Sequence, residues 1–206
     1  RIQDAGLEVS AVSPGFFKGS ADDPAVLDGI ENGLPRACEW AKRWGTDLVS
    51  CFGFERAEEG HVPGAVMGRL DEMAEIAARA GCRLVLENEA VCWGATGVEA
   101  AQMVREIGVD RMGLCWDPGN SARAGSAVPF PDEYEALKDL VTHMHVKNFN
   151  AVSGKWALAE EGVVDWPGQF RALKEDGYEG FVVVETHLDI HPDIFEVAET
   201  EFGALE

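Results

Sequence analysis

The sequence predicts an α/β protein folded as a (β/α) barrel. Short apolar, β-rich runs alternate with longer stretches of helical period, in units of about 30 to 40 residues. Such alternation implies parallel strands joined by helical crossovers. Four of the six candidate strands end at an ionisable residue, and in a barrel all strand ends converge on one mouth. An open doubly wound sheet would spread these ends along a line, and no glycine-rich nucleotide motif follows the first strand.

Six short segments are rich in apolar and β-branched residues, as strands are. They are Leu7–Val12, Asp47–Phe52, Arg83–Glu87, Met112–Trp116, Thr142–Val146 and Phe181–Glu185. Because successive side chains of a strand alternate between its faces, Leu84 and Leu86 are expected on one face and Val85 on the other.

Between these strands, apolar residues recur at spacings of three and four, as in amphipathic helices. The helix candidates are Pro24–Trp44, Gly64–Ala80, Gly97–Ile107, Asp132–Leu140, Trp166–Asp176 and Asp193–Leu205. Gly45, Gly81, Gly108 and Gly177 each follow a helical run and precede the next strand, which is the position of a C-terminal cap.

Composition limits the class of protein. Apolar residues make up 46% of the 206 residues, enough for one sizeable core, and we predict a single domain over residues 1–206. The 17 basic and 37 acidic residues give a formal charge of −20, which disfavours nucleic acid as a partner because phosphates would be repelled. No apolar run approaches the roughly 18 residues that a membrane span needs. The five cysteines form no CxxC pair, so we interpret them as reduced, mostly buried thiols of a cytoplasmic protein.

The barrel is expected to be incomplete in this chain. The opening RIQDAGLEVSAVS has the pattern of a helix end that runs directly into a strand. A complete barrel has eight βα units, so about six units leave two missing, or about 60 to 80 residues. Six parallel strands alone would expose two sheet edges, and we therefore expect N-terminal truncation, an omitted preceding segment, or a partner that covers the gap.

Ionisable residues stand at the ends of four successive candidate strands, namely Glu87, Asp117, His145 and Glu185. Three buried carboxylates that face one mouth would repel and raise one another's pKa, and a divalent cation would remove this repulsion. Three carboxylates and one imidazole suit Mn²⁺, Mg²⁺, Co²⁺ or Zn²⁺, and hard oxygen ligands favour the first two. The four residues are therefore candidate ligands of one metal ion.

Each candidate also has a structural explanation when it is considered alone. A glutamate after a strand commonly caps a helix or faces solvent. Asp117 precedes Pro118 and Gly119 and fits simple turn chemistry. His143 is interpreted as a structural residue. The functional interpretation depends on the coincidence of four candidates at the same place in four successive units.

The ordered set Glu, Asp, His, Glu resembles the xylose isomerase-like sugar phosphate isomerase/epimerase superfamily, whose members are TIM barrels. The segment HVKN is similar to that family's His-x-Lys-Asp strand. The segment EEGVVDWPGQFRALKEDGYEGFVVVE is similar to its ending of Gly-Glu-Gly, Asp-Trp, Gly-Tyr-x-Gly and Glu. The resemblance covers nearly the whole chain and implies that GLEVS is the third barrel strand.

The resemblance implies a divalent-metal-dependent isomerase or epimerase of a small sugar or sugar-like substrate, with proton transfer through an enediolate. Glu87 and Glu185, on opposite sides of the substrate, would form the acid/base pair, and Lys147 would neutralise developing negative charge. Further expected substrate-binding residues are Glu89, Asn120, Trp93 and Trp116.

Two departures from the family pattern leave the reaction open. The family often has Glu-Asn-His where this chain has ENE at 87–89, and Asp-x-Gly-His where it has DPGN at 117–120. A dehydratase or lyase acting on a keto-inositol or sugar acid, and a non-catalytic sugar-binding remnant, are alternatives. An endonuclease on abasic DNA is disfavoured by the negative charge and the missing histidines. The expected partner is a small carbohydrate, and a homo-oligomer is compatible with the sequence.

Overall fold

The computed structural model describes residues 2–15, 17–57, 59–185, 187–188 and 194–203. Within them, a main sheet has six strands in the order β3-β1-β2-β4-β5-β8, and β6 and β7 form a separate two-stranded sheet. The strands are β1 (Leu48–Glu55), β2 (Arg83–Glu87), β3 (Cys92–Trp93), β4 (Met112–Trp116), β5 (Val141–Val146), β6 (Asn148–Asn150), β7 (Lys155–Ala157) and β8 (Val182–Val184).

Five strands of the main sheet run parallel, as predicted. Neighbours β1, β2, β4, β5 and β8 pair in that order, while β3 pairs antiparallel with β1. In the register, Glu87 lies opposite Cys115, Cys115 opposite His143, and His145 opposite Val183. The carboxyl ends of these strands therefore lie side by side at one edge of the sheet.

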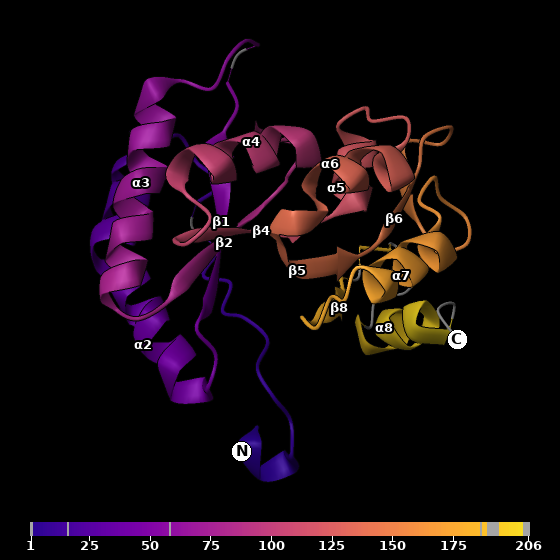
Figure 1. Cartoon of the computed structure of the whole chain (residues 1–206), viewed down its shortest axis with the longest axis horizontal. Coiled ribbons are helices and arrows are strands. Elements are labelled where there is room, and N and C mark those ends of the chain that lie inside the picture. Colours follow the sequence, from indigo (N-terminus) through magenta and orange to yellow (C-terminus); the bar gives the residue numbers. More distant parts are fainter. Residues whose placement is uncertain (1, 16, 58, 186, 189–193, 204–206) are drawn as a thin grey trace.

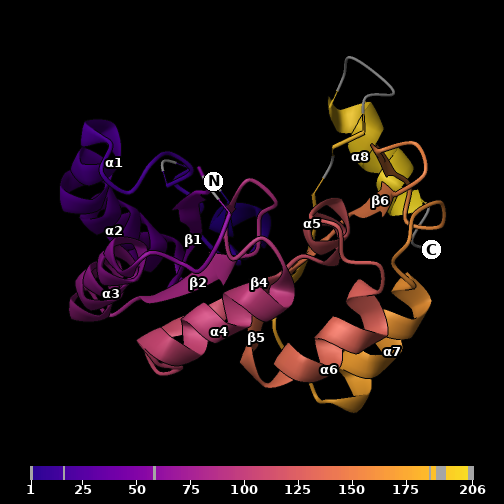
Figure 2. The same ribbon diagram turned by 90° about the horizontal axis from the view of Figure 1, so that it is seen from above.

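Along the chain, helices alternate with the parallel strands of the main sheet. They are α1 (Pro24–Asp28), α2 (Leu34–Trp44), α3 (Gly64–Arg79), α4 (Gly97–Ile107), α5 (Pro118–Arg123), α6 (Tyr134–Leu137), α7 (Trp166–Glu175) and α8 (Ile194–Gly203), with π-type turns at Gly29–Gly33 and Pro129–Glu133 and 3₁₀ turns at Gln3–Ala5 and Lys138–Leu140. In Figure 2, α1, α2 and α3 lie at one end of the sheet and α7 and α8 at the other. None of the helices in the described residues has the length and apolar character needed to cross a bilayer.

Alternate residues of the central strands face the helices and form the hydrophobic core. These residues are Leu84 and Leu86 of β2, Met112, Leu114 and Trp116 of β4, and Met144 and Val146 of β5, all buried in one hydrophobic cluster that also includes side chains of α3 and α4. The intervening residues, including Glu87, Cys115 and His145, point to the opposite face. The alternation places the polar side chains together on the concave side of the sheet.

Most predicted elements are present with small shifts at their ends. The segments Arg83–Glu87, Met112–Trp116 and Gly97–Ile107 have the predicted bounds. The long helix predicted from Pro24 to Trp44 is interrupted by the π-type turn at Gly29–Gly33, where two glycines lower helix propensity. The ends of the last predicted helix, Asp193 and Leu205, lie outside the described residues.

The prediction of a strand at Leu7–Val12 is wrong for the described structure. Only Val12 pairs, through one parallel bridge to Val49, and Leu7 is 61% exposed. A strand is stabilised by a continuous ladder to a neighbour, and this segment has only that one bridge. The helix predicted at Asp132–Leu140 is replaced by the short α6 and its flanking turns. The helix is interrupted at Leu137, whose φ of −134° is not helical.

The main sheet is a curved arc that does not close within the described residues (Figure 1). Residues Leu7–Ser10 and Gly180–Phe181 nevertheless line one cavity of about 620 Å³. The segment before β1 and the segment before β8 therefore approach each other at the amino ends of the strands, as expected for part of a barrel.

All five cysteines are buried and free, as the sequence predicted. Burial raises the pKa of Cys38 and of Cys92 to about 12. Because the thiolate is the reactive form, we expect no cysteine to react with a disulfide reagent such as DTNB at pH 8 until the protein is unfolded. The measurement is the absorbance of the thionitrobenzoate released with and without denaturant. Rapid release from the folded protein would contradict the prediction.

Gly97 at the start of α4 permits close packing of that helix on β4. A Cβ atom at this position would lie 2.2 Å from Cζ3 of Trp116 and 2.6 Å from Cδ2 of Leu137. We expect Gly97→Ala to lower the free energy of unfolding in urea by about 1–3 kcal/mol. The control is Gly68→Ala on the exposed face of α3, where a Cβ atom meets nothing within 4 Å and a gain of about 0.5–1 kcal/mol is expected. An unchanged stability for Gly97→Ala would show that the helix can shift freely.

Candidate metal centre

Four side chains from four strand ends meet on the concave side of the sheet, and we call them the ligand cluster: Glu87, Asp117, His145 and Glu185. One potential ligand atom of each lies within 4.8 Å of all the others. The His145 Nδ1 atom is central, at 3.3 Å from Glu87 Oε1, 3.7 Å from Glu185 Oε2 and 3.9 Å from Asp117 Oδ2. The structure thus brings together the four residues that the sequence selected.

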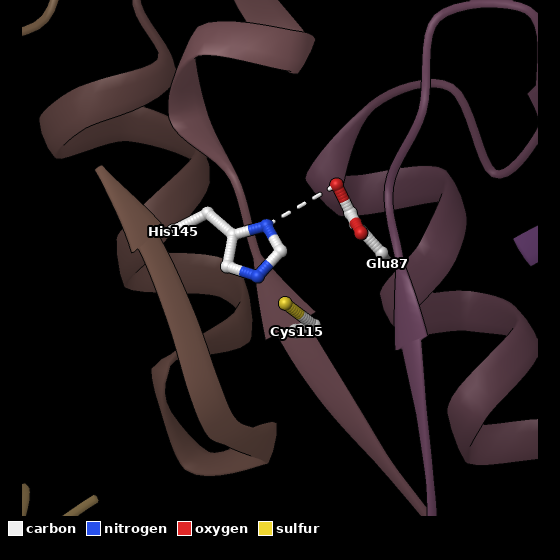
Figure 3. Close-up of side chains that lie close together, drawn as sticks. All are labelled: Glu87, Cys115 and His145. Carbon is white, nitrogen blue, oxygen red and sulfur yellow. Dashed lines mark ion pairs between the residues drawn. The ribbon is translucent and has the colours of Figure 1, made fainter. Parts of the chain in front are cut away.

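The His145 ring lies beside both Glu87 and Cys115, and one potential ligand atom of each of the three residues lies within 4.8 Å of the others. Figure 3 shows its Nδ1 atom directed at the Glu87 carboxylate and the Cys115 sulfur near the other ring nitrogen. Burial raises the pKa of Cys115 to about 11, so its thiol stays protonated at neutral pH. Burial lowers the pKa of His145, but Cys115 and Glu87 outweigh this and raise it above its usual value.

Asp117 is fully buried and uses its two carboxylate oxygens differently. Its Oδ1 atom caps α5 by accepting a hydrogen bond of 2.8 Å from the backbone N–H of Asn120. Its Oδ2 atom faces the ligand cluster, where its partner among the described residues is an ion pair with Lys147 Nζ at 3.0 Å, without the geometry of a hydrogen bond. Burial raises the pKa of Asp117 to about 6, against the opposing influence of Lys147. A buried oxygen of this kind fits a cation ligand.

Lys147 compensates part of the negative charge. Its buried Nζ atom lies 3.0 Å from Asp117 Oδ2 and forms a shorter ion pair with Glu185 Oε2. Burial lowers the pKa of Lys147, but Asp117 and Glu185 raise it above its usual value. For Glu185 the two influences are reversed. Burial raises its pKa, but the positive charges of Lys147 and His145 outweigh burial and bring the pKa below its usual range. One ammonium group thus contacts two carboxylates and neutralises one of their two negative charges.

Two buried asparagines hold the strand ends together. Asn88 donates from Nδ2 to the Asp117 carbonyl at 2.8 Å and accepts from the Asp117 N–H at 2.9 Å. Asn120 donates from Nδ2 to Glu87 Oε1 at 3.2 Å and to the Asn88 carbonyl at 2.9 Å. Asn120, expected to bind substrate, is therefore placed where it orients Glu87. Asn88 was not singled out, although an amide between two acidic residues was visible in ENE.

Trp116 and Trp93, both expected to bind substrate, are buried in the hydrophobic core cluster. Trp116 faces the helices, with its Nε1 donating to Gln169 at 3.0 Å and its ring near Gly97, so its position contradicts a substrate-binding role. The one-residue alternation that directs Cys115 inward directs Trp116 outward. Trp93 is 4% exposed, and its described ring contact is the Arg56 guanidinium, 5.1 Å from the ring centroid.

Glu89 lies in a separate ion-pair group. Its carboxylate is 2.5 Å from Lys18 Nζ and 3.7 Å from the Arg123 guanidinium. Trp156 of β7 extends the polar region: its ring centroid is 4.9 Å from Lys147 Nζ and 5.3 Å from the His187 ring. Trp156 was not among the expected site residues, because its sequence signal is only an aromatic residue in the polar stretch after HVKN.

The chain belongs to the xylose isomerase-like TIM barrel family, whose profile matches residues 1–202. An uncharacterised protein from Methanocaldococcus jannaschii is 26% identical over 119 residues. That alignment covers 56% of this chain and 41% of the relative, so the chain matches less than half of the relative's length.

Solved structures share the fold at low sequence identity. A probable 3-DHS dehydratase from Bacillus anthracis aligns with a TM-score of 0.80 and 15% identity, over 99% of this chain and 78% of its own. A xylose isomerase-like TIM barrel protein from Mycobacterium smegmatis, in complex with magnesium, gives 0.71 and 21%, over 99% and 74%. A 3-keto-D-glucoside 4-epimerase from E. coli gives 0.75 and 19%, over 99% and 80%.

The two hydrogen bonds between Asn88 and the backbone of Asp117 lead to a prediction about stability. Replacing Asn88 by Ala leaves the buried N–H and carbonyl of Asp117 without their described side-chain partner. We expect Asn88→Ala to lower the free energy of unfolding by roughly 1–3 kcal/mol, measured in urea. Asn32→Ala is the control, because Asn32 is exposed and bonds Asp28, and a change within about 0.5 kcal/mol is expected. Equal effects of the two substitutions would contradict a stabilising role for the hydrogen bonds of Asn88.

Proposed function

We propose that this chain is the metal-binding part of an enzyme that isomerises or epimerises a small sugar or sugar-like substrate. The observation that carries the proposal is the ligand cluster, whose four potential ligand atoms lie within 4.8 Å of one another. The carboxyl ends of parallel strands are where barrel enzymes hold their reactive groups. The similarity to the 3-keto-D-glucoside 4-epimerase structure supports the assignment.

The ligand cluster would hold one divalent cation. Its three carboxylates and one imidazole favour Mn²⁺ or Mg²⁺ and also admit Co²⁺ or Zn²⁺. The Asp117 Oδ2 atom is buried and is directed at the ligand cluster, where its described contact is the ion pair with Lys147, and this position fits a cation ligand. The similarity to a magnesium complex supports a divalent metal in general. A bound cation would polarise the carbonyl and hydroxyl oxygens of the substrate and stabilise negative charge on them.

Glu87 and Glu185 are the proposed acid/base pair. They come from β2 and β8, on different sides of His145. Asn120 engages Oε1 of Glu87, and Lys147 engages Oε2 of Glu185, which leaves the second oxygen of each carboxylate to accept or return a proton. Lys147 would stabilise the negative charge that develops when a proton leaves the carbon next to the carbonyl.

A dehydratase is the second candidate, supported by the similarity to the probable 3-DHS dehydratase. Both reactions begin by removal of a proton next to a carbonyl. They differ in whether a neighbouring hydroxyl group then leaves. Mass spectrometry of the product separates them, because isomerisation conserves the mass of the substrate and dehydration removes one water.

The test is hydrogen exchange by the Mn²⁺-loaded protein in D₂O, followed by NMR with D-fructose, D-fructuronate and D-fructose 6-phosphate as probes. We expect deuterium to enter at the carbon next to the carbonyl. Glu185→Gln should slow this exchange by about 100-fold or more, since it removes a proton-transfer group, and should weaken Mn²⁺ binding. The matched control is Glu179→Gln, which alters an exposed glutamate shortly before β8.

Three results would count against the proposal. Exchange at the wild-type rate in Glu185→Gln would contradict the acid/base role of Glu185. Mn²⁺ binding without exchange on any of the probes would favour a non-catalytic sugar-binding module. An anomalous-scattering peak away from the ligand cluster, in a crystal grown with Mn²⁺, would contradict the metal assignment.

A further inference from the structure

A cavity of about 550 Å³ lies beside the ligand cluster. Its lining residues are Arg123, Phe149, Gly154, Lys155, Trp156, His187 and Leu188. The described lining therefore combines two permanently cationic side chains and an imidazole with two aromatic rings, and it includes no carboxylate. A cavity of this size is in the range of small-molecule sites.

Direct contacts join this cavity to the ligand cluster. The Trp156 ring has Lys147 Nζ at 4.9 Å and the Arg123 guanidinium at 5.5 Å from its centroid. Lys147 in turn contacts Asp117, and His187 Nδ1 lies 3.8 Å from Glu185 Oε2. The cavity and the ligand cluster therefore adjoin through Trp156, Lys147 and His187.

Arg123 retains donors for a ligand. Its ion pair in the described structure is with Glu89 at 3.7 Å, and Glu89 is already paired with Lys18 at the shorter distance of 2.5 Å. The side chain of Arg123 is 42% exposed. A guanidinium has five N–H donors in a planar fork that matches the oxygens of a carboxylate or phosphate.

The formal charges around the ligand cluster also favour an anionic ligand. The ligand cluster and Glu89 contribute four carboxylates, and the surrounding cations are Lys18, Arg123, Lys147 and Lys155. These charges cancel, so a bound divalent cation would leave two positive charges. This excess is notable in a chain whose formal charge is −20, because most of the surface repels anions.

We propose that the substrate is anionic: its carboxylate or phosphate group binds Arg123 and Lys155 beside Trp156, while its hydroxy-carbonyl end reaches the ligand cluster. The proposal rests on the proposed function of that cluster. It narrows the substrate class from sugars in general to sugar acids and sugar phosphates. Trp156 supplies an apolar wall for the carbon chain between the two ends.

The experiment is calorimetric titration of the Mn²⁺-loaded protein with D-fructose, D-fructuronate and D-fructose 6-phosphate. We expect at least one anionic probe to bind about 10- to 100-fold more tightly than D-fructose, the range for a charge-assisted pair. Arg123→Gln should reduce this ratio to near one, and Arg123→Lys should retain part of it. The anion that shows the larger ratio identifies carboxylate or phosphate as the natural group.

Arg105→Gln is the matched control, because Arg105 lies on α4 and pairs with exposed Asp139, and it should retain the full ratio. Equal affinities for the neutral and anionic probes would overturn the inference. A preference for anions that persists in Arg123→Gln would also overturn it, since the anion would then bind elsewhere, for example directly to Mn²⁺. If the protein binds no Mn²⁺, the proposed function itself fails, and the two failures are thereby distinguished.

Discussion

Electrostatic repulsion among Glu87, Asp117 and Glu185 is the constraint around which the concave side of this molecule is organised. Three carboxylates in a largely buried position are unfavourable unless positive charge or hydrogen bonds accompany them. Lys147 supplies one charge, at 3.0 Å from Asp117 and in contact with Glu185. The remaining negative charge, on the carboxylates that surround His145, makes the position suited to a divalent cation.

The geometry of this cluster is held from two sides. Apolar residues of β2, β4 and β5 pack against the helices and fix the strands that carry it. At the strand ends, Asn88 joins β2 to Asp117 through both backbone groups of that residue, and Asn120 extends the network to Glu87. These amide hydrogen bonds restrict side-chain motion, which a metal site and an acid/base pair both require.

The proposed chemistry and the proposed substrate class follow from adjacent parts of one mouth. The ligand cluster would bind the reacting end of a substrate, whereas Arg123, Lys155 and Trp156 line the neighbouring cavity. A carbohydrate with an anionic group would fit both the ligand cluster and the neighbouring cavity. The cations gathered there contrast with the formal charge of −20 of the chain, so their placement favours recognition of a specific group at short range.

The sequence by itself determined the alternation of strands and helices and the four strand-end residues, because periodicity and the buried β-rich runs are local properties of the chain. It did not determine which way Trp116 points, that Asn88 and Asn120 clamp Asp117 and Glu87, or that Trp156 lies beside Lys147. It also predicted a strand at Leu7–Val12 that pairs only at Val12. Only the tertiary structure decided these points, because each depends on strand register and on contacts between residues far apart in the chain.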